Sequence, residues 1–158
     1  MSVDDAPATE SIILVTGATD ISPVSTPSEL ELSWSVDRSL CTERAGLHLL
    51  STPSLVLLME RTAIRLVEPL LGPDETTVGT EIRVSHRAPT PEGSTVRIRA
   101  AIEGREGRFI QLHVEAFDEL EQIGVAEHQR AVVDVARYTA RLQSKLEKLR
   151  DVDGSPPQ

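Results

Sequence analysis

The sequence predicts an α+β fold in which a curved antiparallel sheet wraps around one central helix, with an additional helix at the C-terminus. Three observations lead to this prediction. Residues 53–71 form one long apolar segment with helical character. Segments of alternating apolar and polar residues, typical of half-buried strands, lie before and after it. The later segments are separated by short turn signals, as in a meander of antiparallel strands.

The composition is that of a globular protein with one domain. The 158 residues suffice for one hydrophobic core, and 39% of them are hydrophobic. A formal net charge of -9 argues against a nucleic-acid partner, because phosphate contacts require a basic surface. No apolar run reaches the roughly 18 residues that span a bilayer, so no membrane partner is expected. The N-terminus lacks a secretion-signal pattern, and the single cysteine, Cys41, is typical of a reducing compartment, so we expect a cytoplasmic protein.

The chain is expected to divide into three parts. Residues 1–27 are rich in Ser, Thr, Pro, Ala and Asp, which predicts a mobile N-terminal arm around one short apolar run. Residues 28–138 contain the strand-like segments and the long apolar helix, and form the expected folded domain. Residues 139–158 are expected to hold a charged C-terminal helix and a tail.

The first half of the folded domain predicts one strand and the long helix. Residues 30–36 alternate between apolar and polar side chains, which indicates a half-buried strand. A loop is expected from there through Leu50. Pro53 stands at a position that proline favours in the first turn of a helix, and Gly72 and the two residues after it end the helix.

The second half predicts four strands and a helix. Alternation indicates strands within 78–86, 96–102, 110–116 and about 123–136, joined by turns at 89–93, 104–107 and 118–121. From Tyr138 onward, leucines recur at helical spacing. A sheet that covers a nearly apolar helix has to curve around it, which is the hot-dog architecture. A cystatin-like or cone-shaped α+β fold fits the same element order less well.

One acidic residue stands out on the long helix. With successive residues about 100° apart, Glu60 falls inside the apolar arc, between Val67 and Leu71. A carboxylate there loses hydration unless it is paired, and functional sites are where such a placement is most often tolerated. Glu60 is therefore either a functional acid or a structural one held by an arginine or by backbone donors.

Two further side chains are candidates for the same site. Thr52 precedes Pro53 and could cap the helix, or its hydroxyl could point into a pocket at the helix N-terminus. The amides at that end of a helix could also polarise a carbonyl group. His86 continues the apolar face of its strand and could be a core residue or a catalytic base. The other three histidines are expected to face solvent: His48, His113 and His128. No metal site is expected, because the histidines lack the spacing of metal ligands.

These residues carry a resemblance to a known family. Thr52, Glu60, Gly79, His86 and Arg130 stand in the order and spacing of the fluoroacetyl-CoA thioesterase family. The sequence around His86, from 78 to 93, resembles the family's histidine-containing strand and the turn after it, and residues 123–133 resemble its last strand. The likeness covers about residues 28–138.

The resemblance implies a hot-dog homodimer with active sites near the subunit interface. It implies that Thr52, Glu60 and His86 form the catalytic set, and that Gly79 and Arg130 contact the substrate. The chain differs from the family in one respect: the fluoroacetyl enzyme has aromatic residues over its acyl pocket, whereas residues 37–56 contain none here. Selectivity for a fluoroacetyl group is therefore not expected to carry over.

The sequence thus predicts a thioesterase that hydrolyses an acyl-CoA or acyl-carrier thioester to the free acid and thiol. Glu60 would act as general base or nucleophile, His86 would move the proton, and Thr52 would hydrogen-bond the carboxylate or the carbonyl. No cofactor is expected, because thioesters are already activated. The alternatives are a non-catalytic acyl-CoA-binding hot-dog module and a hydratase on the same fold.

Overall fold

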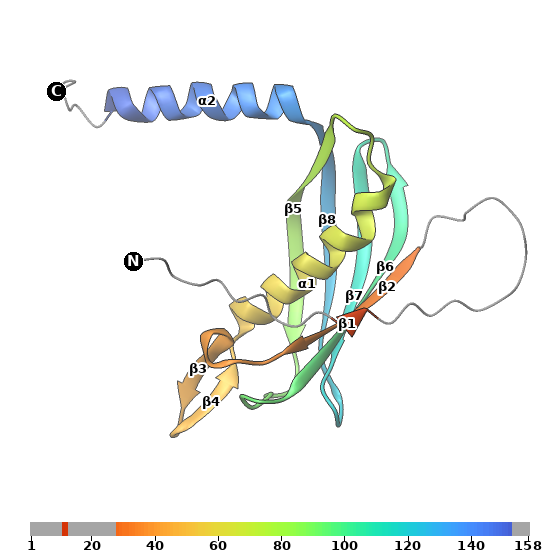
Figure 1. Cartoon of the computed structure of the whole chain (residues 1–158), viewed down its shortest axis with the longest axis vertical. Coiled ribbons are helices and arrows are strands. Elements are labelled where there is room, and N and C mark those ends of the chain that lie inside the picture. The colour runs from red at the N-terminus through yellow and green to blue at the C-terminus, as the bar shows by residue number, and fades with distance from the viewer. Residues whose placement is uncertain (1–10, 13–27, 153–158) are drawn as a thin grey trace, which may run out of the picture.

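The computed structural model describes residues 11–12 and 28–152 of the chain (Figure 1). Eight strands and two α-helices follow one another, with a 3₁₀ turn before β3 and another after α1. The elements are β1 (Ser11–Ile12), β2 (Glu29–Ser35), β3 (Cys41–Arg44), β4 (Leu47–Leu50), α1 (Thr52–Val67), β5 (Glu75–His86), β6 (Thr95–Glu106), β7 (Phe109–Phe117), β8 (Gln122–Asp134) and α2 (Val135–Val152).

A single antiparallel sheet curves around α1, as the sequence predicted. Six strands lie in the order β1-β2-β6-β7-β8-β5, so the strand that follows α1 in sequence is at one edge. Figure 1 shows α1 lying across the concave face of this sheet. The expected α+β hot-dog arrangement, with one central helix and a C-terminal helix, is confirmed.

Local sequence explains where α1 begins and ends. Ser51 caps its N-terminus, because the Ser51 side chain accepts a hydrogen bond from the amide of Ser54, and a proline follows in the first turn. At the other end, Pro69 has no amide to donate, and the α-helix gives way to the 3₁₀ turn Glu68–Leu70. The face that α1 presents to the sheet is fully buried: Leu55, Leu58, Met59, Thr62, Ala63, Leu66 and Val67.

The helix and the sheet approach each other closely at a glycine of β8. A Cβ added to Gly124 would stand 2.9 Å from the Cδ2 atom of Leu55 and 3.4 Å from the Cε atom of Met59. Gly124 pairs with His86 across the β5–β8 ladder. This glycine therefore lets the N-terminal half of α1 lie against the end of β5 that carries His86.

The structure differs from the sequence prediction in two local features. The segment expected to be a loop through Leu50 contains the hairpin β3–β4, whose turn places Ala45 and Gly46 at positive φ, 51° and 76°. Residues 104–106 of the link expected at 104–107 belong to β6, which continues to Glu106 after a β-bulge between Ile102 and Gly104, and the turn follows at 107–108. The bulge adds a residue to the strand, which a period-two pattern does not detect.

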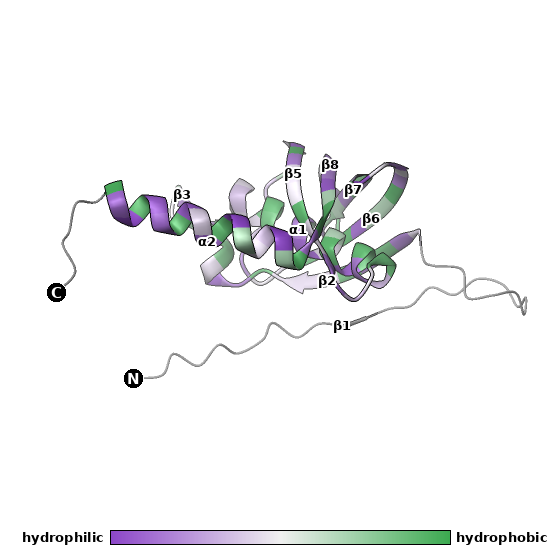
Figure 2. Ribbon diagram, turned by 90° about the horizontal axis from the view of Figure 1, so that it is seen from above, coloured by the Kyte–Doolittle hydropathy of each residue, from purple (hydrophilic) through white to green (hydrophobic). Residues whose placement is uncertain are grey.

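The C-terminal helix is longer than predicted and begins at Val135 rather than after Tyr138. It contains no buried residue and projects away from the sheet, past the edge strand β5 (Figures 1 and 2). Within the predicted N-terminal arm, Ser11 and Ile12 pair with β2, and the remaining residues of that arm lie outside the described part of the chain. Among the described helices, none is long and apolar enough to cross a membrane.

Candidate functional site

The five residues predicted for the site lie in two groups, and the first is built around Glu60. The Oε1 atom of Glu60 accepts a hydrogen bond from Nη1 of Arg130 at 3.0 Å. The Arg130 side chain is only 3% exposed, and its other donors reach the hydroxyl and the carbonyl oxygen of Thr77 at 3.0 and 3.2 Å. Glu60 on α1 and Arg130 on β8 thus form an ion pair in which the arginine is held rigidly from β5.

Glu60 itself is less buried than the sequence predicted. Its side chain is 39% exposed in the single chain. The apolar arc of α1 is wider than the face that the sheet covers, and Glu60 lies at its margin with the partly exposed Val56 and Ile64. The expectation that Glu60 is buried is therefore wrong for one copy of the chain, and its carboxylate is held by an arginine, Arg130.

His128 is a member of this group that the sequence prediction assigned to solvent. It is 3% exposed, its Nδ1 atom lies 2.8 Å from the carbonyl oxygen of Glu81, and its Nε2 atom lies 3.2 Å from Nη1 of Arg130. A carbonyl can only accept and a guanidinium can only donate, so the ring is neutral with its proton on Nδ1. Burial, with the charge of Arg130 as a further cause, lowers the pKa of His128 from its ordinary value of 6.5, against the opposing effects of the Glu81 carbonyl and Glu60. Residues two apart on a strand share a face, so the expectation that Arg130 belongs to the site also indicates that His128 lies beside it.

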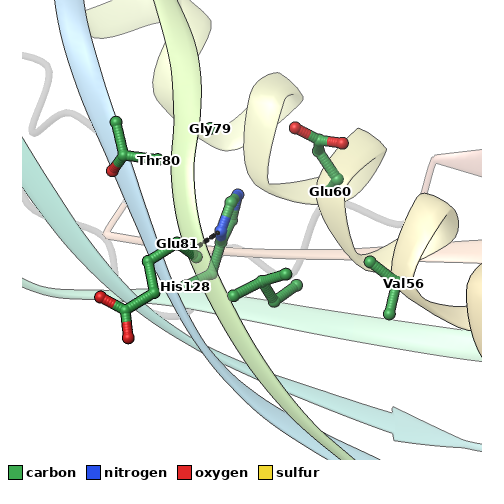
Figure 3. A pocket seen from close by; sticks show the side chains of 7 residues that line it. Val56, Glu60, Gly79, Thr80, Glu81 and His128 are labelled. Carbon is green, nitrogen blue, oxygen red and sulfur yellow. Dashed lines mark hydrogen bonds between the residues drawn. The ribbon is translucent and has the colours of Figure 1, made fainter.

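Gly79 lies directly against the ion pair. A Cβ at this position would stand 2.7 Å from Oε1 of Glu60 and 3.3 Å from Cε1 of His128. The register of β5 against β8 shifts between Gly79 and Glu81, so Thr80 is an extra residue at a bulge beside the site. Figure 3 shows Glu60 on α1 facing Gly79 and His128 across a cavity of about 220 Å³, which is lined by Val56, Glu60, Gly79, Thr80, Glu81, Ile82 and His128.

The second group is the pair Thr52 and His86, at the N-terminus of α1. Because Ser51 is the N-cap, the Thr52 hydroxyl does not cap the helix and instead lies 2.9 Å from Nδ1 of His86. Among the described residues, Nε2 of His86 is one of two buried side-chain polar atoms without a hydrogen-bond partner. A buried, unsatisfied imidazole nitrogen costs free energy and is most often retained where the ring has a function.

A wider cavity adjoins this pair. It measures about 610 Å³ and lies between the β3–β4 hairpin, the start of α1 and the end of β5. Beside Thr52 and His86, apolar and basic residues line it: Leu49, Leu50, Pro53, Ala88 and Pro89 on the apolar side, and Arg44 and Arg87. None of the described residues that line this cavity is aromatic.

The two groups are separated along α1. Thr52 and Glu60 are eight residues apart, which corresponds to about 12 Å along the axis of an α-helix. Glu60 and His86 also line different cavities. Within one chain, therefore, the structure does not bring Glu60 to His86, although both lie on the side of the molecule bounded by α1 and the edge strand β5.

The amides at the start of α1 are also less available than expected. Pro53 has no amide hydrogen, the amide of Ser54 donates to the Ser51 side chain, and that of Leu55 donates to the Ser51 carbonyl. The prediction that several amides of this turn polarise a carbonyl therefore finds little support. The bulge at Thr80 is a more suitable source, because an extra residue in a strand leaves its backbone groups outside the ladder.

A third cluster lies on the outer face of the sheet, away from both cavities. His113 faces outward as predicted, and its Nδ1 atom lies 2.7 Å from a carboxylate oxygen of Glu127. The bulged residue Glu103 brings a second carboxylate, and the three possible ligand atoms lie within 4.8 Å of one another. This proximity depends on the sheet register, which explains why sequence spacing did not indicate it.

Comparison with known proteins supplies the family. A family model described as fluoroacetyl-CoA-specific thioesterase matches residues 36–136. The chain belongs to this family. It is 38% identical over 95 residues to the fluoroacetyl-CoA thioesterase of Streptantibioticus cattleyicolor, an alignment that covers 60% of this chain and 68% of that enzyme. The resemblance noted in the sequence is thus confirmed, and the protein is a thioester hydrolase of the fluoroacetyl-CoA thioesterase family.

Solved structures agree with this assignment. The fluoroacetyl-CoA thioesterase FlK superposes with a TM-score of 0.70 at 28% identity, covering 78% of this chain and 98% of that one. A thioesterase superfamily member from Thermus thermophilus superposes with a TM-score of 0.73 at 24% identity, covering 82% and 98% of the two chains. The second likeness supports the hot-dog fold, and the first supports the fold together with the family.

Gly79→Ala is expected to lower kcat/KM for thioester hydrolysis by at least about tenfold, on the scale of displacing a catalytic group. The added Cβ would stand 2.7 Å from Oε1 of Glu60 and push the carboxylate off Arg130. Gly104→Ala is the matched control, because a Cβ there meets nothing within 4 Å. Steady-state kinetics and thermal unfolding of both variants test the prediction, and a Gly79→Ala enzyme as active as the control would contradict it.

His128 is expected to make stability depend on pH. Its pKa in the folded state is lowered by burial, so the unfolded chain binds more protons once the pH falls below about 6.5. The stabilisation is complete above that pH and is lost as the pH falls towards the folded-state pKa, with a slope of at most about 1.4 kcal/mol per pH unit. Urea unfolding from pH 7.5 to 5 should show a shallower decline in His128→Gln than in the wild type. Equal slopes would exclude this role of His128.

Proposed function

We propose that the protein is a cytoplasmic acyl-CoA thioesterase whose active sites form between the two chains of a homodimer. Relatives named for fluoroacetyl-CoA support a CoA thioester as substrate. The free thiol of Cys41 is consistent with a reducing compartment. No cofactor enters the proposal, because hydrolysis of an activated thioester needs only a nucleophile, a proton acceptor and a polarising group.

The separation of the candidate residues into two groups is the observation that carries the proposal. Glu60, Gly79 and Arg130 supply a held carboxylate, and Thr52 and His86 supply a hydroxyl–imidazole pair. Neither group alone contains an acid, a hydroxyl and an unpaired imidazole. A second copy that brings one group to the other would complete the set.

The edge strand β5 is the natural contact for that second copy. It is 12 residues long and pairs with β8 on one side, which leaves backbone donors and acceptors along its other side. On the neighbouring surface of α1, Leu57 and Ile64 are 39% and 38% exposed, although both are large and apolar. Pairing of two β5 strands would extend the sheet and bury these side chains.

Antiparallel pairing about a two-fold axis would also assemble the site. With the axis between Gly79 and His86, the Glu60 group of one copy comes towards the Thr52–His86 group of the other. The same operation creates a second, equivalent site. Each dimer would therefore carry two sites, each with a carboxylate from one chain and an imidazole from its partner.

The chemistry assigned to these groups is hydrolysis of the thioester. The thioester carbonyl lies against the bulge at Thr80, and a water oxygen, activated by Glu60, bonds to the carbonyl carbon. The proton passes through the carboxylate to His86, which gives it to the sulfur as the carbon–sulfur bond breaks. Thr52 keeps the ring oriented through its contact with Nδ1. An alternative mechanism uses the same residues. In it, the Glu60 carboxylate attacks the carbonyl carbon and forms an anhydride, which water then cleaves.

Complementation between inactive chains tests the composite site. Glu60→Gln and His86→Ala are each expected to lower kcat by at least about 10²-fold, the usual scale for a general acid–base residue. When the two variants are co-expressed and pair at random, about half of the dimers are mixed and each holds one intact site, so activity should recover to about one quarter of the wild type.

Glu60→Gln co-expressed with the double variant Glu60→Gln/His86→Ala is the control, in which no intact site can form. Equal, negligible activity in both mixtures would show that each site lies within one chain. A light-scattering mass near 17.2 kDa at micromolar concentration would refute the dimer itself. If the wild type released no free thiol from any acyl-CoA, the result would favour a non-catalytic acyl-CoA-binding module over a thioesterase.

Substrate preference is expected to favour acyl groups larger than fluoroacetyl. Aliphatic side chains, with Leu49 and Leu50 among them, line the cavity of about 610 Å³ beside His86. We expect kcat/KM for fluoroacetyl-CoA to exceed that for acetyl-CoA by less than about tenfold, equivalent to about 1.4 kcal/mol in transition-state binding. An acyl chain of about four or more carbons, or an arylacyl group, should be hydrolysed faster than either. Thiol release from a graded acyl-CoA series measures this, and a fluoroacetyl preference of several orders of magnitude would overturn it.

A further inference from the structure

His128 is buried beside the candidate catalytic acid, yet the proposed hydrolysis assigns it no step. On β8 it lies between Ile82 of β5 and Leu112 of β7. Its ring lines the cavity of about 220 Å³ together with Glu60 and Gly79 (Figure 3). A titratable group buried in such a cavity is a candidate for a functional role, which its contacts have to define.

One nitrogen of Arg130 links this ring to the carboxylate. Nη1 carries two hydrogens, and it lies 3.0 Å from Oε1 of Glu60 and 3.2 Å from Nε2 of His128. The edge of the guanidinium formed by Nε and Nη2 donates to Thr77 instead. Among the described residues, Glu60 and His128 are thus the two partners of Nη1. Because the guanidinium is planar and rigid, an acceptor at Nε2 of the ring fixes the direction in which Nη1 meets the carboxylate.

The other ring nitrogen determines which proton the ring carries. Nδ1 lies 2.8 Å from the carbonyl oxygen of Glu81, so Nδ1 holds the proton and Nε2 keeps its lone pair for Arg130. Glu81 directly follows Thr80, the extra residue at the bulge of β5. His128 therefore connects this bulge to the guanidinium that faces Glu60.

A second proton on the ring would break this arrangement. It would come from solvent and bind to Nε2, so that an N–H group of the ring would face an N–H group of Arg130. Among the described residues, the charged groups that act on the ring are Arg130 and Glu60, and its neighbours on β5 and β7 are apolar. The Glu81 carboxylate points away from the ring and pairs with Arg83 (Figure 3).

We infer that His128 is a positioning residue for thioester hydrolysis: its neutral ring holds Arg130, and through it the Glu60 carboxylate, and protonation of Nε2 releases both. This inference rests on the proposed function, in which Glu60 activates the attacking water. His128 itself touches no substrate in this role. The residue makes activity fall in acid through a proton that binds neither to Glu60 nor to His86.

Two substitutions that each keep one hydrogen bond of the ring test the inference. A glutamine amide reaches the position of Nε2 and can accept from Arg130, whereas an asparagine amide reaches that of Nδ1 and can donate to Glu81. At pH 7.5, His128→Asn is expected to lower kcat/KM for an acyl-CoA by at least about tenfold, because the carboxylate loses its fixed position. His128→Gln should stay within about threefold of the wild type. His113→Asn is the matched control, since it makes the same change on the outer face of the sheet, and it should hydrolyse the substrate as the wild type does.

The pH profile and the ring proton separate positioning from a purely structural role. From pH 8 to 5, kcat/KM should fall at least about threefold less in His128→Gln than in the wild type. Protonation of Glu60 or His86 lowers activity in both enzymes, whereas only the wild type has a ring to protonate at position 128. Nitrogen-15 NMR of the wild type at pH 7.5 should show His128 protonated on Nδ1 and unprotonated on Nε2.

Several results would overturn the inference while leaving the proposed function intact. Wild-type kcat/KM in His128→Asn is one, and a proton on Nε2 at pH 7.5 is another. Rescue by asparagine rather than glutamine is a third, since the necessary contact would then be the one to Glu81. Equal losses in both variants, with pH profiles parallel to that of the wild type, would show a role in packing alone. A wild type that releases no thiol from any acyl-CoA would overturn the proposed function and this inference together.

Discussion

Packing of α1 against the concave face of the sheet is the constraint on which the rest of the structure depends. The buried face of the helix supplies much of the core, and Gly124 lets the helix approach β8 closely. Once the axis of α1 is set by this packing, the positions of Thr52 and Glu60 follow, because a helix is rigid over two turns. Both functional groups are therefore placed by the same apolar contact that stabilises the fold.

The sheet then determines the state of each group. Arg130 donates hydrogen bonds to Thr77 and to the ring of His128, which hold its side chain in place. Its charge is therefore directed at Glu60 rather than at solvent. Gly79 leaves the space that the carboxylate occupies. At the other end, capping by Ser51 frees the Thr52 hydroxyl for His86. Such supporting contacts keep reactive side chains in a fixed geometry before substrate binds.

The edge of the sheet connects architecture with the proposed function. A curved sheet that ends at β5 leaves one long unpaired strand next to a partly exposed helix, and both candidate groups border that edge. In the proposed dimer, the exposed apolar residues of α1 and the separated groups have one explanation, namely that a second chain lies there. The outer-face cluster of Glu103, His113 and Glu127 has no part in this arrangement.

The sequence by itself determined the α+β class, the long helix, the later strands and the family, because these depend on periodicity and on residue order. It also singled out Glu60 and His86. Only the tertiary structure decided that Ser51 caps α1, that His128 is buried, that Glu60 pairs with Arg130, and that the candidate residues form two groups. These facts depend on strand register, on bulges and on which part of the apolar arc the sheet covers. A pattern along one chain does not contain those contacts, since they join residues that are distant in sequence.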